Sequence, residues 1–112
     1  MRVLMKVTLP VETGNEAISN GTLGTTLQSI LAEQKPEAAY FFAQEGKRGG
    51  IVVVDMKDTA QIPALAEPWF LAFNANVEFH PVMTAEDVAR ALPAIEQTVR
   101  KYAAKSRAAA AG

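Results

Sequence analysis

The fold is decided by the stretch Gly50-Ile51-Val52-Val53-Val54-Asp55-Met56, which is apolar on both of its alternating faces. A strand of this kind is normally central in its sheet and covered on both sides. A second run, Ala38–Ala43, precedes it, and the glycine-rich segment Gly46–Gly50 predicts a hairpin turn between the two runs. We therefore expect a central hairpin with helices on one face and a different cover on the other.

Two further strands complete the predicted sheet. The segment Arg2–Leu9 alternates with period two, and Asn76–Val82 does the same. The order along the chain becomes strand, helix, strand, strand, helix, strand, helix. This order indicates an α+β fold of the split βαβ type, in which a four-stranded antiparallel sheet carries two helices on one face and a third helix follows at the C-terminus.

The first helical segment is predicted over Asn15–Gln34, with an interruption at Gly21–Gly24. Its apolar residues recur with helical spacing at Leu23, Leu27, Ile30 and Leu31. We expect Pro10–Gly14 to end the preceding strand as a loop. The helix stops at Lys35-Pro36, because the residue before proline is pushed out of the helical region.

The second helical segment covers Ile62 to Phe73, and Asp58 or Thr59 can cap its start. Trp69 lies on its apolar stripe, where it is expected to form core or the wall of a pocket. Pro68 lacks a backbone donor and is expected to kink or end the helix near Glu67.

The final helix is predicted to begin at Thr84, which can act as its N-cap with acidic residues in the first turn. Pro93 is expected to split it, and the Ala108–Ala111 tail, from about residue 105, to fray. One seam of apolar residues follows the helix: Val88, Leu92, Ile95, Val99 and Tyr102.

Composition narrows the class of protein. The 112 residues suit one domain, and 11 Lys plus Arg against 12 Asp plus Glu leave no basic stripe for a nucleic acid partner. The absence of cysteine excludes disulfides, thiolate zinc sites and cysteine nucleophiles. The charged start at Arg2 and Lys6 does not look like a signal peptide, and no long apolar run predicts a membrane span. We expect a cytoplasmic protein without a membrane partner.

The charged pair Lys47-Arg48 lies in the glycine-rich segment and is interpreted as a solvated turn rather than an anion site. Metal binding is not expected, because the single histidine and the scattered carboxylates show no ligand spacing. No cofactor is predicted.

His80 is the candidate for chemistry, because its unperturbed pKa lies near neutrality. In an alternating strand it shares a face with Glu78. If this strand pairs antiparallel with the first one, Lys6 lies opposite or diagonal to Glu78. Two interpretations stay open: a structural Lys6–Glu78 ion pair with His80 merely hydrogen-bonded, or a polar patch that binds ligand or catalyses a reaction. Tyr40 can offer a phenol to the same ligand or act only as a packing residue.

Three segments resemble a family of short, functionally uncharacterised bacterial proteins: Lys35–Phe41, Ala66–Phe70 and Val77–Met83. In architecture the chain is similar to the wider dimeric α/β-barrel group, which includes muconolactone isomerase-like proteins and small cofactor-independent monooxygenases. The resemblance implies a ferredoxin-like protomer whose open sheet face packs against a partner's, with a cavity on the inner side of the sheet. It transfers no catalytic residue to this chain.

Three hypotheses of function follow. The first is a homodimeric protein that binds a small organic ligand in a cavity on the open sheet face, with Lys6, Tyr40, Glu78 and Trp69 in contact with it. The second is a cofactor-independent isomerase, lyase or monooxygenase, in which His80 moves a proton and Lys6 or Tyr40 stabilises negative charge. The third is a structural or regulatory dimer. The chain's own C-terminal helix is the alternative cover for the open face.

Overall fold

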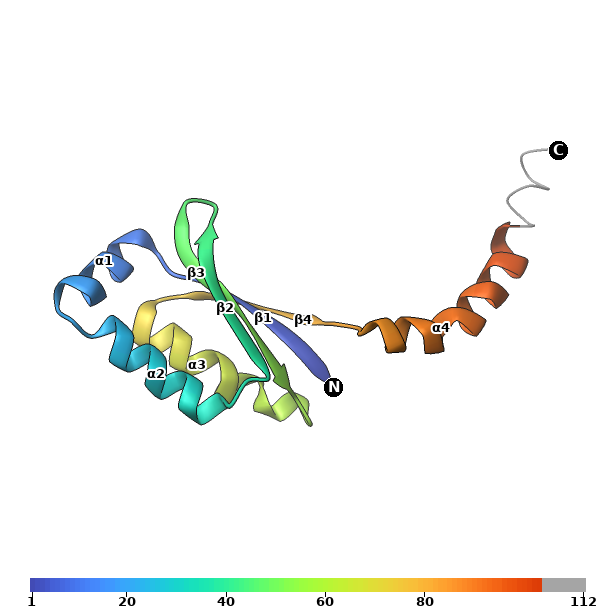
Figure 1. The fold of residues 1–112 in the computed structure, drawn as a ribbon, viewed down its shortest axis with the longest axis horizontal. Helices are drawn as coiled ribbons and strands as arrows, with labels where there is room; N and C mark the ends of the chain where they lie inside the picture. Colours follow the sequence, from blue (N-terminus) through green and yellow to red (C-terminus); the bar gives the residue numbers. More distant parts are fainter. Residues whose placement is uncertain (104–112) are drawn as a thin grey trace. The chain divides into compact units, whose positions relative to one another are not determined.

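The structure is a computed structural model that describes residues 1–103 (Figure 1). It divides into two compact units, Met1–Val82 and a second unit that begins at Met83. The first unit holds the whole sheet and three helices, and the second unit begins with a helix. In the described part, residues 1–103, no helix is both long and apolar enough to cross a membrane.

The sheet consists of four antiparallel strands, β1 (Arg2–Thr8), β2 (Ala38–Gln44), β3 (Lys47–Asp55) and β4 (Asn76–Pro81). Their order is β2-β3-β1-β4, so the sheet is open and β2 and β4 are its edges. The predicted four-stranded antiparallel sheet is confirmed, and so is the pairing of the first strand with the last.

The turn between β2 and β3 is shorter than predicted. It consists of two residues, Glu45 and Gly46, which both have positive φ, 51° and 76°. Positive φ at both positions is the geometry that matches the twist of a hairpin. The prediction that Gly49 and Gly50 belong to the turn is wrong, because both lie within β3. A Cβ at Gly49 would lie 2.6 Å from the carbonyl oxygen of Val7, so the glycine permits close strand contact.

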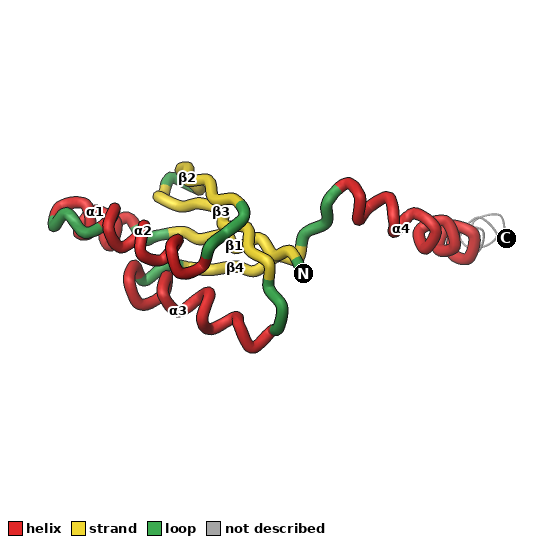
Figure 2. Tube along the Cα trace, turned by 60° about the horizontal axis from the view of Figure 1, so that its bottom comes forward, coloured by secondary structure: helices red, strands yellow, loops and turns green. Residues whose placement is uncertain are grey.

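Three helices cover one face of the sheet: α1 (Val11–Ser19), α2 (Leu23–Gln34) and α3 (Ile62–Phe73) (Figure 2). The core lies between these helices and the strands, and its most buried large side chains are Trp69, Phe73, Met5, Val3, Val7 and Val52. A 3-10 turn, η1 (Thr59–Gln61), precedes α3, and Asp58 caps it by accepting a hydrogen bond from the Ala60 amide.

The predicted helix start at Asn15 is wrong, because α1 already begins at Val11, although β1 does end before Pro10. Gly14, expected in the segment that ends the first strand, lies inside this helix, where it packs against Arg48. A Cβ at this position would lie 2.7 Å from Nη1 of Arg48. The glycine therefore makes room for a side chain from β3.

The prediction that the helix ends at Pro68, near Glu67, is also wrong, because α3 continues to Phe73, whereas the alternative of a kink at Pro68 stays a prediction. A proline inside a helix costs about 3 kcal/mol. Loss of a buried Trp or Phe side chain costs about 3–5 kcal/mol, and both Trp69 and Phe73 are buried just after the proline. Ala64, whose carbonyl loses its donor, is exposed and can bind water.

The second unit contains α4 (Ala85–Thr98) and a π-helical turn, η2 (Val99–Ala103). The predicted cap is confirmed: Thr84 and Asp87 each accept a hydrogen bond from the other's backbone amide. Pro93 does not split α4, because the carbonyl that it leaves without a donor belongs to the exposed residue Ala89. The predicted fraying at Ala108–Ala111 lies outside the described residues. The predicted seam is exposed at every position: Val88 41%, Leu92 48%, Ile95 48%, Val99 54% and Tyr102 58%.

Candidate functional site

The open face of the sheet carries most of the residues proposed from the sequence. Lys6 lies directly opposite Glu78 on the neighbouring strand, and Lys6 Nζ is 3.8 Å from Glu78 Oε2. The predicted cross-strand pair is confirmed. Its role in ligand binding stays a prediction.

Strand register extends this pair into a row. Tyr40 lies opposite Ile51, Ile51 opposite Lys6, and Lys6 opposite Glu78. His80 lies in the adjacent row, opposite Leu4. Side chains that share a cross-strand row share a face, and alternate positions along one strand do too. The sheet therefore brings Lys6, Tyr40, Glu78 and His80 to one face.

Trp69 is not part of that group. It lies in α3 on the opposite side of the sheet and is 1% exposed. Its indole nitrogen donates a hydrogen bond of 3.3 Å to Oε1 of Gln34. The sequence placed Trp69 correctly in the core or a pocket wall, but it belongs to a different site from the other four residues.

Two ion pairs lie at one end of the open face. Arg2 pairs with Glu37, and the N-terminal amine of Met1 lies 3.0 Å from Asp55 Oδ1. The hydrogen bond from this amine, together with its positive charge, holds the pKa of Asp55 below its ordinary value. These charges lie beside the apolar middle of the face, where Leu4, Ile51 and Val53 are half-buried.

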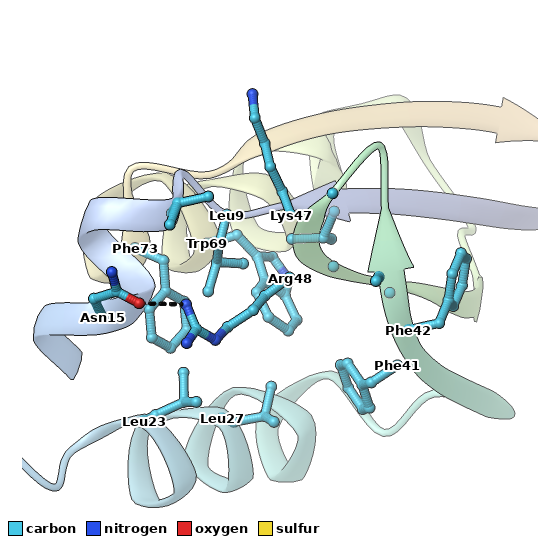
Figure 3. Close-up of a pocket in the computed structure, with 16 residues that line it drawn as sticks. Leu9, Asn15, Leu23, Leu27, Phe41, Phe42, Lys47, Arg48, Trp69 and Phe73 are labelled. Atoms are coloured by element: carbon cyan, nitrogen blue, oxygen red, sulfur yellow. Dashed lines mark hydrogen bonds between the residues drawn. The ribbon is translucent and has the colours of Figure 1, made fainter. Parts of the chain in front are cut away.

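A pocket of about 560 Å³ lies on the other face, between the helices and the β2–β3 hairpin (Figure 3). Leu23 and Leu27 of α2 form one wall, and Trp69 and Phe73 of α3 form another. Phe41 lies at the β2 side and is 49% exposed. The pocket exists because β2 is an edge strand that the helices cover incompletely.

Arg48 is the polar side chain that enters this pocket. It is half-buried, and its Nη1 donates a hydrogen bond of 3.1 Å to Oδ1 of Asn15 in α1 (Figure 3). Within residues 1–103, no carboxylate forms an ion pair with it. The only other charged residue that lines the pocket, Lys47, is exposed, and its amine points away from Arg48.

The interpretation of Lys47-Arg48 as a solvated turn is therefore wrong: neither residue lies in the turn, and only Lys47 is exposed. Both residues lie in β3, because the turn consists of Glu45 and Gly46. The sequence did contain a signal that would have found the residue: Arg48 has the same parity as Val52 and Val54, whose side chains face the helices.

Residues 25–96 match a family model described as "Domain of unknown function (DUF3303)". The chain belongs to this family. The DUF3303 match runs from α2 into α4 and includes Arg48, Trp69 and His80, whereas Lys6 and Asn15 precede it. No curated protein matches the chain. In the described residues, no group of three or more His, Asp or Glu side chains lies close enough together to hold a metal ion.

Proposed function

We propose that the protein binds a small, largely apolar organic molecule in the pocket between the helices and the β2–β3 hairpin. The observation that carries this proposal is the pocket itself, with a volume of about 560 Å³ and walls of leucine, valine and aromatic side chains. Small-molecule sites are mostly apolar clefts of about 300–1,000 Å³ with a few polar groups. This proposal moves the expected site from the open face to the helix-covered face.

Trp69 makes the proposal testable, because it is the single tryptophan of the chain and it lines the pocket. Titration with the neutral dye N-phenyl-1-naphthylamine should quench Trp69 fluorescence and enhance emission of the dye. Ala43 also lines the pocket and is exposed, so Ala43→Phe should fill the space without disturbing the core. This variant should weaken dye binding about tenfold.

The matched control is Ala64→Phe, at an exposed position of α3 that does not line the pocket. It should bind the dye as the wild-type protein does. Equal binding by wild-type protein, Ala43→Phe and Ala64→Phe would exclude this pocket as the site.

We also propose that the protomer is ferredoxin-like and that two copies pair through their open faces. The strand order and the three helices on one face support this arrangement. The open face has an apolar middle, where Tyr40 is 64% and Phe42 is 49% exposed, and charged residues lie beside it. A second copy is the occupant that matches this face, because it brings an equally apolar middle. Light scattering at micromolar concentration should then give twice the chain mass of 12.0 kDa.

A second candidate function is supported by the residues that share the open face. In a cofactor-independent isomerase, lyase or monooxygenase, His80 would move a proton while Lys6 or Tyr40 stabilised developing negative charge. Native mass spectrometry of the purified protein tests this candidate by identifying a molecule bound at the interface. Turnover of that molecule should depend on pH and be lost in His80→Ala. A structural dimer would show neither the bound molecule nor the turnover.

A further inference from the structure

The guanidinium of Arg48 has more hydrogen-bond donors than the protein uses. A guanidinium carries five N–H donors in a planar fork. Among the described residues, its side chain has one acceptor, the amide oxygen of Asn15 at 3.1 Å. The group is half-buried in a pocket whose walls are otherwise largely apolar. A cation in such surroundings is stabilised when an anion is bound beside it.

The guanidinium is held in place from the α1 side. Asn15 accepts its hydrogen bond, and Gly14 leaves the space that the side chain fills, since a Cβ there would lie 2.7 Å from Nη1 and 3.2 Å from Cδ. The leucines of α2 and the rings of α3 lie around it (Figure 3). Position and orientation are therefore determined before any ligand arrives, which lowers the entropic cost of binding.

The charge of the site selects the class of anion. One positive group enters the pocket, because the amine of Lys47 points away from it (Figure 3). A single guanidinium fork matches the planar, singly charged carboxylate in a bidentate pair. A phosphate or a dicarboxylate would bring more negative charge than this pocket balances.

We propose that the ligand of the pocket is an amphipathic carboxylic acid, bound through its carboxylate to Arg48 with its apolar body against α2 and α3. This inference rests on the proposed binding function and adds the chemical class of the ligand. Octanoate and 1-octanol are suitable probes, because they share a chain length and differ in their head group.

The experiment is displacement of N-phenyl-1-naphthylamine by each probe at neutral pH. Octanoate should bind the wild-type protein at least about tenfold more tightly than 1-octanol, although its charge makes it the better hydrated molecule. Arg48→Gln should bind octanoate about tenfold more weakly than the wild-type protein does. The affinity of this variant for 1-octanol should change less than about threefold.

Two glycine variants test the same site without changing its charge. Gly14→Ala places a methyl group 2.7 Å from Nη1 of Arg48, which forces the guanidinium to shift, so octanoate should bind several-fold more weakly and 1-octanol unchanged. Gly24→Ala is the matched control in α2, since a Cβ there meets nothing within 4 Å. It should leave both affinities as they are. These variants keep the test valid if Arg48→Gln fails to fold, which circular dichroism would show.

The possible failures are distinguishable. If the dye binds the wild-type protein and Ala43→Phe equally, the proposed binding function is wrong; if the dye binds as proposed but neither probe displaces it, only the carboxylate class is wrong. If 1-octanol binds but octanoate binds no more tightly, or if Arg48→Gln weakens both probes equally, the pocket remains a binding site and the role of Arg48 as carboxylate anchor is wrong.

Discussion

The two faces of the sheet differ although the same strands build them. On β1, the side chains of Val3, Met5 and Val7 face the helices and are 1%, 0% and 2% exposed, whereas the alternate residues on the open face are only half-buried. The covered face has its pocket at the β2 edge, where helix cover ends. The pocket in this chain arises where helices cover an edge strand incompletely, and in our proposals the charge on each face determines what occupies it.

Neighbouring residues of β3 offer the strongest test of this difference. Val52 faces the helices and is fully buried, whereas Ile51 faces the open side and is half-buried. Val52→Lys buries an unpaired charge and should lower the free energy of unfolding by more than about 4 kcal/mol, enough to unfold most small domains. Ile51→Lys should keep the fold and prevent the proposed dimer from forming. Circular dichroism and light scattering measure the two effects, and a folded Val52→Lys protein would contradict the assignment of faces.

Two glycines, Gly50 and Gly24, test whether close strand spacing on the pocket side requires a residue without a side chain. A Cβ at Gly50 would lie 2.6 Å from the carbonyl oxygen of Tyr40, which belongs to the backbone and cannot move alone. Gly50→Ala should therefore cost about 1–3 kcal/mol of stability. Gly24→Ala, in an open helical position, should stabilise the protein by up to about 1 kcal/mol. Urea denaturation compares the two variants, and equal midpoints would show that strand spacing does not depend on Gly50.

The Lys6–Glu78 pair reports whether the open face is covered. Both side chains are substantially exposed in the protomer, 39% and 58%. A double-mutant cycle with Lys6→Ala and Glu78→Ala should then give a coupling of less than about 1 kcal/mol at protein concentrations low enough to keep the chain monomeric. In the dimer, reduced access of water should make the coupling larger. Identical couplings in the monomer and at concentrations that favour the dimer would mean that this pair stays in water.

Asp55 gives the smallest expected effect. Because its pKa is lowered in the folded protein, its carboxylate stabilises the fold at pH values above its ordinary pKa of 3.8. That contribution is lost as the pH falls through the lower, folded value. Asp55→Asn should show a slightly lower melting temperature near neutral pH and a smaller loss of stability in acid than the wild-type protein. If the wild-type protein and Asp55→Asn lose the same stability as the pH falls, the interaction of Asp55 with the Met1 amine is contradicted.

Periodic patterns predicted more of this molecule than single residues did. Alternation in β1 and β4, with an assumed antiparallel pairing, predicted Lys6 opposite or diagonal to Glu78 and His80 on the same face, and the strand register agrees with both. Pro68 and the glycines were misinterpreted because local rules treat them as interruptions. In the folded chain, Pro68 is tolerated beside buried aromatic rings, and Gly14 and Gly50 provide space for neighbouring atoms.

The pocket was missed for a related reason. Its residues come from all three helices of the first unit and three of its strands, so no short stretch of sequence contains it. Arg48 lies next to Lys47 and near three glycines in the sequence, and this context suggested a solvated turn. Arg48 can be assigned to the strand only when the start of β3 is known. That start is set by the two-residue turn at Glu45 and Gly46.

The edge position of β2 also bears on how the protein behaves in concentrated solution. One side of this strand has no hydrogen-bonded neighbour in the sheet, and its segment Ala38–Ala43 contains three consecutive aromatic residues and no charge. Strands of this composition at a free edge are templates for the addition of further strands from other chains. The opposite edge, β4, contains Glu78 and Pro81, which oppose such growth. Self-association into fibrils would therefore begin at β2, and a charged residue at Phe42 would protect the chain against it.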